Sequence, residues 1–178
     1  LEIALDVMAG PMERRSKGWQ LNLAECNKTS LKDFKVAIWS NDELAPVSKE
    51  IAQRCEEVGN QLNSVGTTVS FVAKPEHDFM KAEINYQLLL QSVMQSGLPE
   101  DEYQKIEKLA SSLDKNDLSV DAILAKGTVL SHRNWIRQNY AREQIKISWS
   151  KFFEEWDVLI CPQLATTAIE HDHRKISE

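Results

Sequence analysis

The chain has 178 residues, of which 42% are hydrophobic and 27% charged, proportions typical of a soluble globular protein rather than a disordered one. Its formal net charge of −6 argues against a nucleic-acid-binding surface, because such a surface needs clustered lysine and arginine. The sequence has no apolar run of the ~18 residues that a membrane span requires, and its three widely spaced cysteines, which form no metal-binding pattern, favour reduced thiols in the cytoplasm.

The first eight residues predict a helix that is apolar on nearly every side. Residues 1–8 include Leu, Ile, Ala, Val and Met, and Gly10 and Pro11 provide a stop signal. A helix of this kind must be covered by other structure. We therefore expect that an upstream part of the protein lies outside these 178 residues.

Residues 11–33 then predict a polar surface connection with a few apolar anchors, Trp19, Leu21 and Leu23.

Residues 34–72 predict a β–α–β unit. Short runs of bulky apolar residues at 34–39 and 67–72 predict two buried strands. Between them, Pro46 favours the first turn of a helix that ends at Gly66. Its apolar face repeats every three or four positions: Val47, Ile51, Cys55, Val58, Leu62 and Val65. Strands joined in this way are nearly always parallel, so the predicted fold class is α/β.

Helices dominate the next segment. One is predicted over residues 79–94, with an apolar face and a stop at 97–99, and a shorter one follows around 103–109. The face of the first comprises Phe79, Ala82, Tyr86, Leu89, Leu90 and Val93. After a loop at 111–118 and a helix near 119–126, Ser131 is placed to cap a long helix. Its stripe, which we interpret as core packing, comprises Trp135, Ile145, Trp149, Phe152 and Trp156.

A third buried strand is predicted over residues 157–162, where a proline ends it. The following residues, 163–173, have no periodicity and predict a loop. Ligands of parallel sheets bind beyond the carboxyl ends of the strands. This loop is therefore a candidate pocket wall.

In order along the chain, several of these segments resemble the second half of amidase signature enzymes. The similar segments are LEIALDVMAGP, WQL, LKDFKVAIW, PVSKEI, VGTTV, FFEEWDVLICP and TTAIEHDH. The similarity runs from residue 1 to about residue 173 and is weakest over 76–130. It implies a mixed β-sheet core covered by helices, with residues 1–178 forming the carboxy-terminal portion of a single amidase-like α/β domain.

The same resemblance implies the chemistry. Enzymes of this family hydrolyse the C–N bond of a carboxylic amide through a serine, a second serine in a cis peptide bond, and a lysine, without a cofactor. A neutral lysine takes the proton of the attacking hydroxyl through the bridging serine, and backbone N–H groups stabilise the oxyanion. The expected partner is a small-molecule amide. Whether the full-length protein is a homo-oligomer or acts within an amidotransferase stays open.

The residues that carry out this chemistry in the family lie upstream of the helix at residues 1–8. The sequence contains no Gly-Ser-Ser-Gly-like segment, and its Ser-Lys pairs lack a glycine turn. These pairs are Ser16-Lys17, Ser48-Lys49 and Ser150-Lys151. We therefore assign no catalytic residue within the chain. By position alone, the loop from Pro162 to Ala168 resembles the stretch that approaches the substrate, which gives four pocket candidates, Pro162, Gln163, Thr166 and Thr167.

Other reactive side chains have structural interpretations. His171 and His173 would share one side of an extended segment, but a metal site needs three or four ligands, so we predict a hydrogen-bonding loop and no metal. Cys161, in a strand expected to be buried, is interpreted as a small hydrophobe rather than a nucleophile. His77 and His132 are expected at helix ends or on the surface.

One alternative of another class remains open, a non-catalytic α/β binding or scaffold domain. A glycine- and serine-rich loop with a preceding lysine upstream would favour the enzyme.

Overall fold

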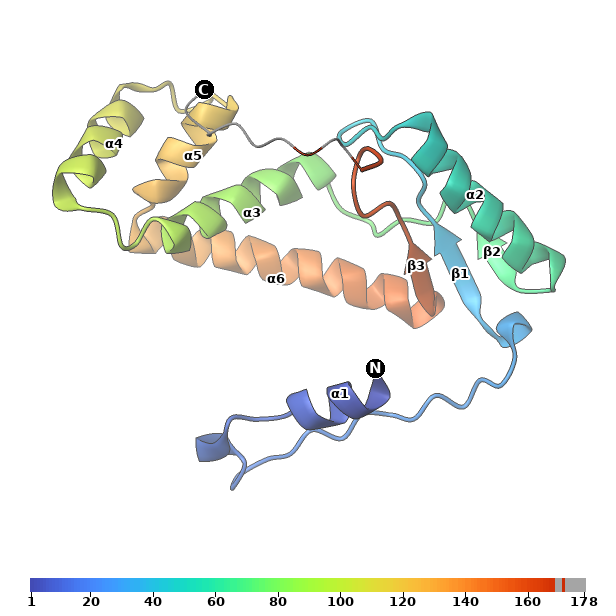
Figure 1. Cartoon of the computed structure of the whole chain (residues 1–178). Helices are drawn as coiled ribbons and strands as arrows, with labels where there is room; N and C mark the ends of the chain where they lie inside the picture. Colours follow the sequence, from blue (N-terminus) through green and yellow to red (C-terminus); the bar gives the residue numbers. More distant parts are fainter. Residues whose placement is uncertain (169–170, 172–178) are drawn as a thin grey trace.

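The computed structural model describes residues 1–168 and residue 171, and its centre is a small parallel sheet (Figure 1). The strand order is β2-β1-β3, with bounds Lys35–Ile38 for β1, Thr68–Ser70 for β2 and Val158–Ile160 for β3. The α/β class is confirmed, and every strand pair in the described part of the chain is parallel.

Fully buried strand residues occur only in the central strand, within the described part of the chain. Val36, Ala37 and Ile38 of β1 form the middle of the core, whereas β2 and β3 are partly exposed. The prediction of three buried strands was therefore wrong for the outer two, because each has a single neighbour within the described sheet. Both are also shorter than the apolar runs that predicted them.

Helix α2, Lys49–Ser64, packs on β1 and β2. A Cβ atom on Gly59 would lie 2.7 Å from Phe71 Cε1 and 2.8 Å from Ile38 Cγ1, so the absence of a side chain lets this helix approach the sheet. The predicted apolar face was partly wrong: Ile51, Cys55 and Leu62 are partly buried as expected, whereas Val58 is exposed and Gly59 is buried. The helix also begins later than Pro46 suggested.

Four further helices form a second packed body. They are α3 (Phe79–Met94), α4 (Glu100–Ser112), α5 (Val120–Thr128) and α6 (His132–Glu155). Helix α3 packs on α5 and α6, and α4 packs on α5 (Figure 1). Gly127 lets α5 approach α3 closely, because a Cβ there would lie 2.8 Å from Gln91 Cβ and 3.2 Å from the Leu88 backbone. Among the described helices, none is both long and apolar enough to cross a bilayer.

Side-chain caps fix where three of these helices begin. Asp78, Ser119 and Ser131 accept hydrogen bonds from the backbone N–H groups of residues 81, 122 and 134. The predicted cap at Ser131 is thus confirmed.

The predicted face of α3 was partly wrong, since Tyr86 and Val93 are exposed, whereas Asn85 is buried and donates to the Gln138 side chain at 2.8 Å.

The amino-terminal segment lies apart from the sheet. Helix α1, Glu2–Met8, and two 3₁₀ turns at Glu13–Arg15 and Leu31–Asp33 are joined by a long connection (Figure 1). Ile3 and Val7 of α1 are each 80% exposed, so no described residue provides the cover that we expected for this helix. The three predicted anchors of the connection, Trp19, Leu21 and Leu23, are also exposed.

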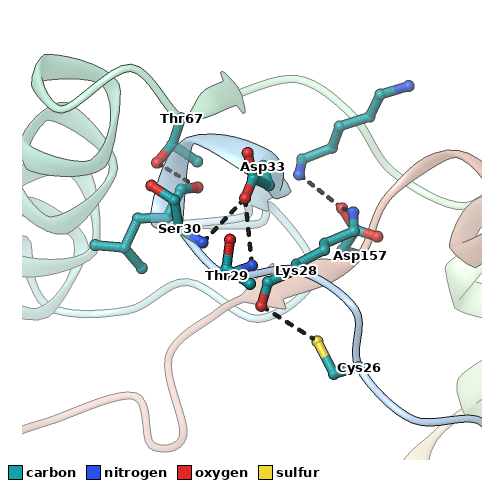
Figure 2. A network of polar contacts seen from close by, with 9 residues as sticks. Cys26, Lys28, Thr29, Ser30, Asp33, Thr67 and Asp157 are labelled. Atoms are coloured by element: carbon teal, nitrogen blue, oxygen red, sulfur yellow. Dashed lines mark hydrogen bonds and ion pairs between the residues drawn. The ribbon is translucent and has the colours of Figure 1, made fainter.

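Polar contacts join the end of this connection to the sheet (Figure 2). The Asp157 carboxylate accepts hydrogen bonds from the Lys28 ammonium group and, at 2.8 Å, from the Lys35 N–H. Asp33 accepts from the Ser30 N–H at 2.9 Å, and the buried Thr67 donates to the Leu31 carbonyl at 3.0 Å. These bonds hold residues 28–33 against both outer strands.

Candidate functional site

A cavity of about 320 Å³ lies beyond the carboxyl ends of β1 and β3. Parallel strands place their carboxyl ends on one edge of the sheet, and ligands of such sheets bind outside that edge. The lining residues are Trp39, Asn41, Asp42, Ala45, Pro46, Val47, Cys161, Pro162, Gln163, Leu164 and Ala165. Most of them are apolar, as in sites for small molecules.

The segment between β1 and α2 forms one wall. The Asn41 side chain accepts a hydrogen bond from the Val47 N–H at 3.0 Å, and Asp42 accepts one from the Leu44 N–H at 3.0 Å. Asparagine and aspartate commonly close turns in this way. The wall therefore keeps its shape through hydrogen bonds between its own side chains and its own backbone N–H groups.

The loop after β3 forms the other wall. Its backbone lies beside the segment between β1 and α2 (Figure 1). The Ser48 N–H donates to the Ala165 carbonyl at 2.8 Å, and the Trp39 N–H donates to the Ile160 carbonyl at 2.9 Å. The first bond joins the two loops, and the second joins the strand ends from which they start. Both bonds therefore keep the two walls next to each other.

Asp42 has the most contacts of the polar groups in the lining. Its carboxylate accepts from the Trp39 indole at 3.1 Å and from the Lys74 ammonium group at 2.8 Å. The bond from Lys74 and that from the Leu44 N–H lower the pKa of Asp42 below its ordinary value, against the effect of burial. Asp42 is therefore a paired carboxylate at neutral pH.

The four predicted pocket residues divide into two pairs. Pro162 and Gln163 line the cavity. Thr166 and Thr167 are exposed farther along the same loop and are not in the lining. His171 is exposed, and His173 lies outside the described residues. In residues 1–168 and 171, no three His, Cys, Asp or Glu side chains are grouped to hold a metal ion.

Cys161 also lines the cavity, and it is exposed rather than buried. The expectation of a buried strand residue was wrong, because β3 ends at Ile160 and Cys161 begins the loop. All three cysteines are free thiols.

The three Ser-Lys pairs lie in a 3₁₀ turn, at the start of α2 and on α6. Ser16 donates to the Glu13 carbonyl at 2.7 Å in a 3₁₀ turn, and Ser150 is exposed on α6. Ser48 is the N-cap residue of α2, and its hydroxyl is buried without a hydrogen-bond partner among the described residues. Lys17, Lys49 and Lys151 are all exposed.

A larger cavity, of about 670 Å³, lies between residues 72–77 and α6. In its wall, His77 and Ser148 share a hydrogen bond of 3.1 Å, and the His77 ring lies 4.3 Å from that of Phe79. Burial lowers the pKa of His77, and the charge of Asp78 opposes this. His77 is thus half-buried in the packing between α3 and α6, while His132 is exposed at the start of α6.

Comparison with known proteins gives one family. The family model described as Amidase matches residues 1–177 of the chain. No curated protein and no solved structure gives a significant match. The matched range includes the sheet, the helices and both walls of the smaller cavity.

Proposed function

Because the chain belongs to the amidase family, we propose that it is part of an enzyme that hydrolyses the C–N bond of a small-molecule carboxylic amide. In this proposal, residues 1–178 are the carboxy-terminal portion of a single α/β domain. The observation that carries it is the family match over nearly the whole chain.

The proposed reaction is acyl transfer to a serine, followed by hydrolysis, with a second serine and a lysine moving the proton. Polypeptide outside the 178 residues supplies these three groups in our proposal. Two observations support this: the sequence has no glycine- and serine-rich loop, and Ser16, Ser48 and Ser150 are in a turn, at a buried helix cap and on a helix surface.

The role that we propose for this chain is to form one wall of the substrate pocket. The cavity at the carboxyl ends of β1 and β3 has the volume and apolar lining of a small-ligand site. Pro162 and Gln163 then contact the substrate, and Thr166 and Thr167 lie toward the outer end of the same loop.

The free thiols of the three cysteines agree with a cytoplasmic location, which is also part of the proposal.

Ammonia release tests the proposal. Benzamide and acetamide are incubated with the enzyme that contains this chain and, separately, with the 178 residues alone. We expect ammonia from the first and none from the second. Turnover by the 178 residues alone would contradict the external location of the catalytic groups. Absence of turnover by the whole enzyme on a panel of simple amides would instead favour a scaffold without catalysis.

A further inference from the structure

The Trp39 indole is held from three sides at the edge of the smaller cavity. Its Nε1–H donates to Asp42 at 3.1 Å, and the Lys74 ammonium group lies 4.5 Å from the centre of the ring system. The Phe79 ring packs at 4.7 Å in an edge arrangement. Trp39 is thereby fixed as an aromatic wall of the cavity, which it also lines.

Asp42 connects these restraints. Its Oδ2 atom accepts both from Trp39 and, at 2.8 Å, from Lys74, while its Oδ1 atom accepts from the Leu44 N–H at 3.0 Å. The carboxylate is 20% exposed, so its partners satisfy it in a partly desolvated position. Removing it would release both the indole edge and the ammonium group over the indole face.

The same pairing determines the charge that the cavity presents. The carboxylate of Asp42 is balanced by Lys74, and the other lining side chains are neutral amides, a thiol, prolines and small or branched apolar groups. A cavity of about 150 Å³ is enough to hold benzene, so about 320 Å³ has room for an aryl group. Aromatic rings gain from offset or edge contact with an indole.

We propose that Asp42 is a positioning residue, which holds Trp39 and Lys74 so that the cavity accepts the uncharged aromatic part of an amide substrate. The inference rests on the proposed amidase function and adds to it a substrate class, aryl amides, and the residue that selects them.

The kinetic test uses the whole enzyme and the ratio of kcat/KM for benzamide to that for acetamide. We expect the wild type to prefer benzamide. Asp42→Asn should lower the ratio about tenfold, which is the effect of losing one pocket contact. The change should arise from a higher KM for benzamide, with kcat unchanged. Asp42→Glu keeps the carboxylate and should retain more of the preference. Glu43→Gln, a neighbouring exposed carboxylate outside the lining, is the matched control and should behave as the wild type.

A binding measurement separates this inference from the proposed function. Benzamide binding is followed by the Trp39 fluorescence, taken as the difference between each protein and its Trp39→Phe form. We expect Asp42→Asn to raise the dissociation constant about tenfold, and Glu43→Gln to leave it unchanged. If the wild type hydrolyses amides but neither ratio nor affinity depends on Asp42, the inference is overturned and the function stands. If the wild type hydrolyses no amide, the proposed function is overturned. If, in addition, Asp42→Asn leaves the dissociation constant for benzamide unchanged, the inference is overturned as well.

Discussion

At the scale of single residues, the three thiols differ in ways that chemistry can detect. Cys26 and Cys161 are exposed, whereas Cys55 is half-buried on α2, and burial raises the pKa of the Cys55 thiol, with smaller effects from Cys161 and Glu56. The thiolate is the reactive form. We therefore predict that iodoacetamide modifies Cys26 and Cys161 well before Cys55, as followed by peptide mass spectrometry.

The same experiment reports on the cavity, because Cys161 lines it and Cys26 does not. Saturating benzamide should slow the modification of Cys161 and leave that of Cys26 unchanged. Equal rates with and without benzamide at both positions would argue against binding in this cavity.

Asp157 gives a prediction for pH dependence. The hydrogen bond from Lys28, followed by that from the Lys35 N–H, lowers the pKa of Asp157 in the folded protein. A carboxylate with a lowered folded pKa stabilises the fold above its unfolded pKa of about 3.9, and this stabilisation is lost as the pH falls through the folded pKa. Asp157→Asn should therefore lower the urea midpoint at neutral pH.

The difference between Asp157→Asn and the wild type should shrink as the pH falls through the folded pKa of Asp157. Glu25→Gln serves as the control, since Glu25 is an exposed carboxylate on the same connection. If the difference in urea midpoint between Asp157→Asn and the wild type stays constant over the acid range, Asp157 acts through its shape rather than its charge.

Residue roles that depend on partners far along the chain could not be predicted from the sequence. Asp42 follows the predicted strand at 34–39 after a short gap, but its partner Lys74 lies 32 positions later and no periodicity connects the two. Pro162 and Gln163, by contrast, could be placed near the cavity, because the loop after a strand of a parallel sheet is a candidate pocket wall and the family resemblance indicated the same loop. Local sequence thus located the loop, while the tertiary contacts determine which of its side chains face the cavity.

At the scale of helices and strands, two glycines should be sensitive to a single methyl group. A Cβ at Gly59 or Gly127 would come within 2.8 Å or less of a neighbouring side chain across a packed contact. Overpacking of this kind costs about 1–3 kcal/mol. We predict that Gly59→Ala and Gly127→Ala each lower the free energy of unfolding by that amount in urea titrations.

Gly97 is the control for these substitutions. It lies in the turn between α3 and α4, and a Cβ there meets no atom within 4 Å. Gly97→Ala should leave stability unchanged or raise it slightly. Equal losses at all three positions would contradict close packing as the cause, because a Cβ at Gly97 meets no neighbouring atom.

The helices were predicted better than their buried faces. The bounds of α3 agree with the prediction, and α6 begins directly after its predicted cap, because caps and stop signals are local. The faces differ because a helix can bury a small or polar residue when its partner requires it. Gly59 does so against Phe71, and Asn85 does so against Gln138.

At the scale of the whole molecule, α1 leaves an apolar surface open. Ile3 and Val7 are each 80% exposed, and no described residue covers them. Large exposed apolar patches favour association. We predict that the 178 residues alone self-associate and bind an apolar dye, and that Ile3→Glu combined with Val7→Glu reduces both, as measured by light scattering and dye fluorescence. Glu2→Gln, at an exposed polar position of the same helix, should reduce neither.

The central claim, that substrate binds beside the loop after β3, is most directly tested by filling the cavity. Ala165→Phe adds bulk to the lining, while its carbonyl can still accept from Ser48. Ala168→Phe places the same bulk on an exposed part of the loop outside the lining. In the whole enzyme, we predict that Ala165→Phe lowers kcat/KM for benzamide at least about tenfold and that Ala168→Phe does not. Equal activity of the two variants would contradict the account.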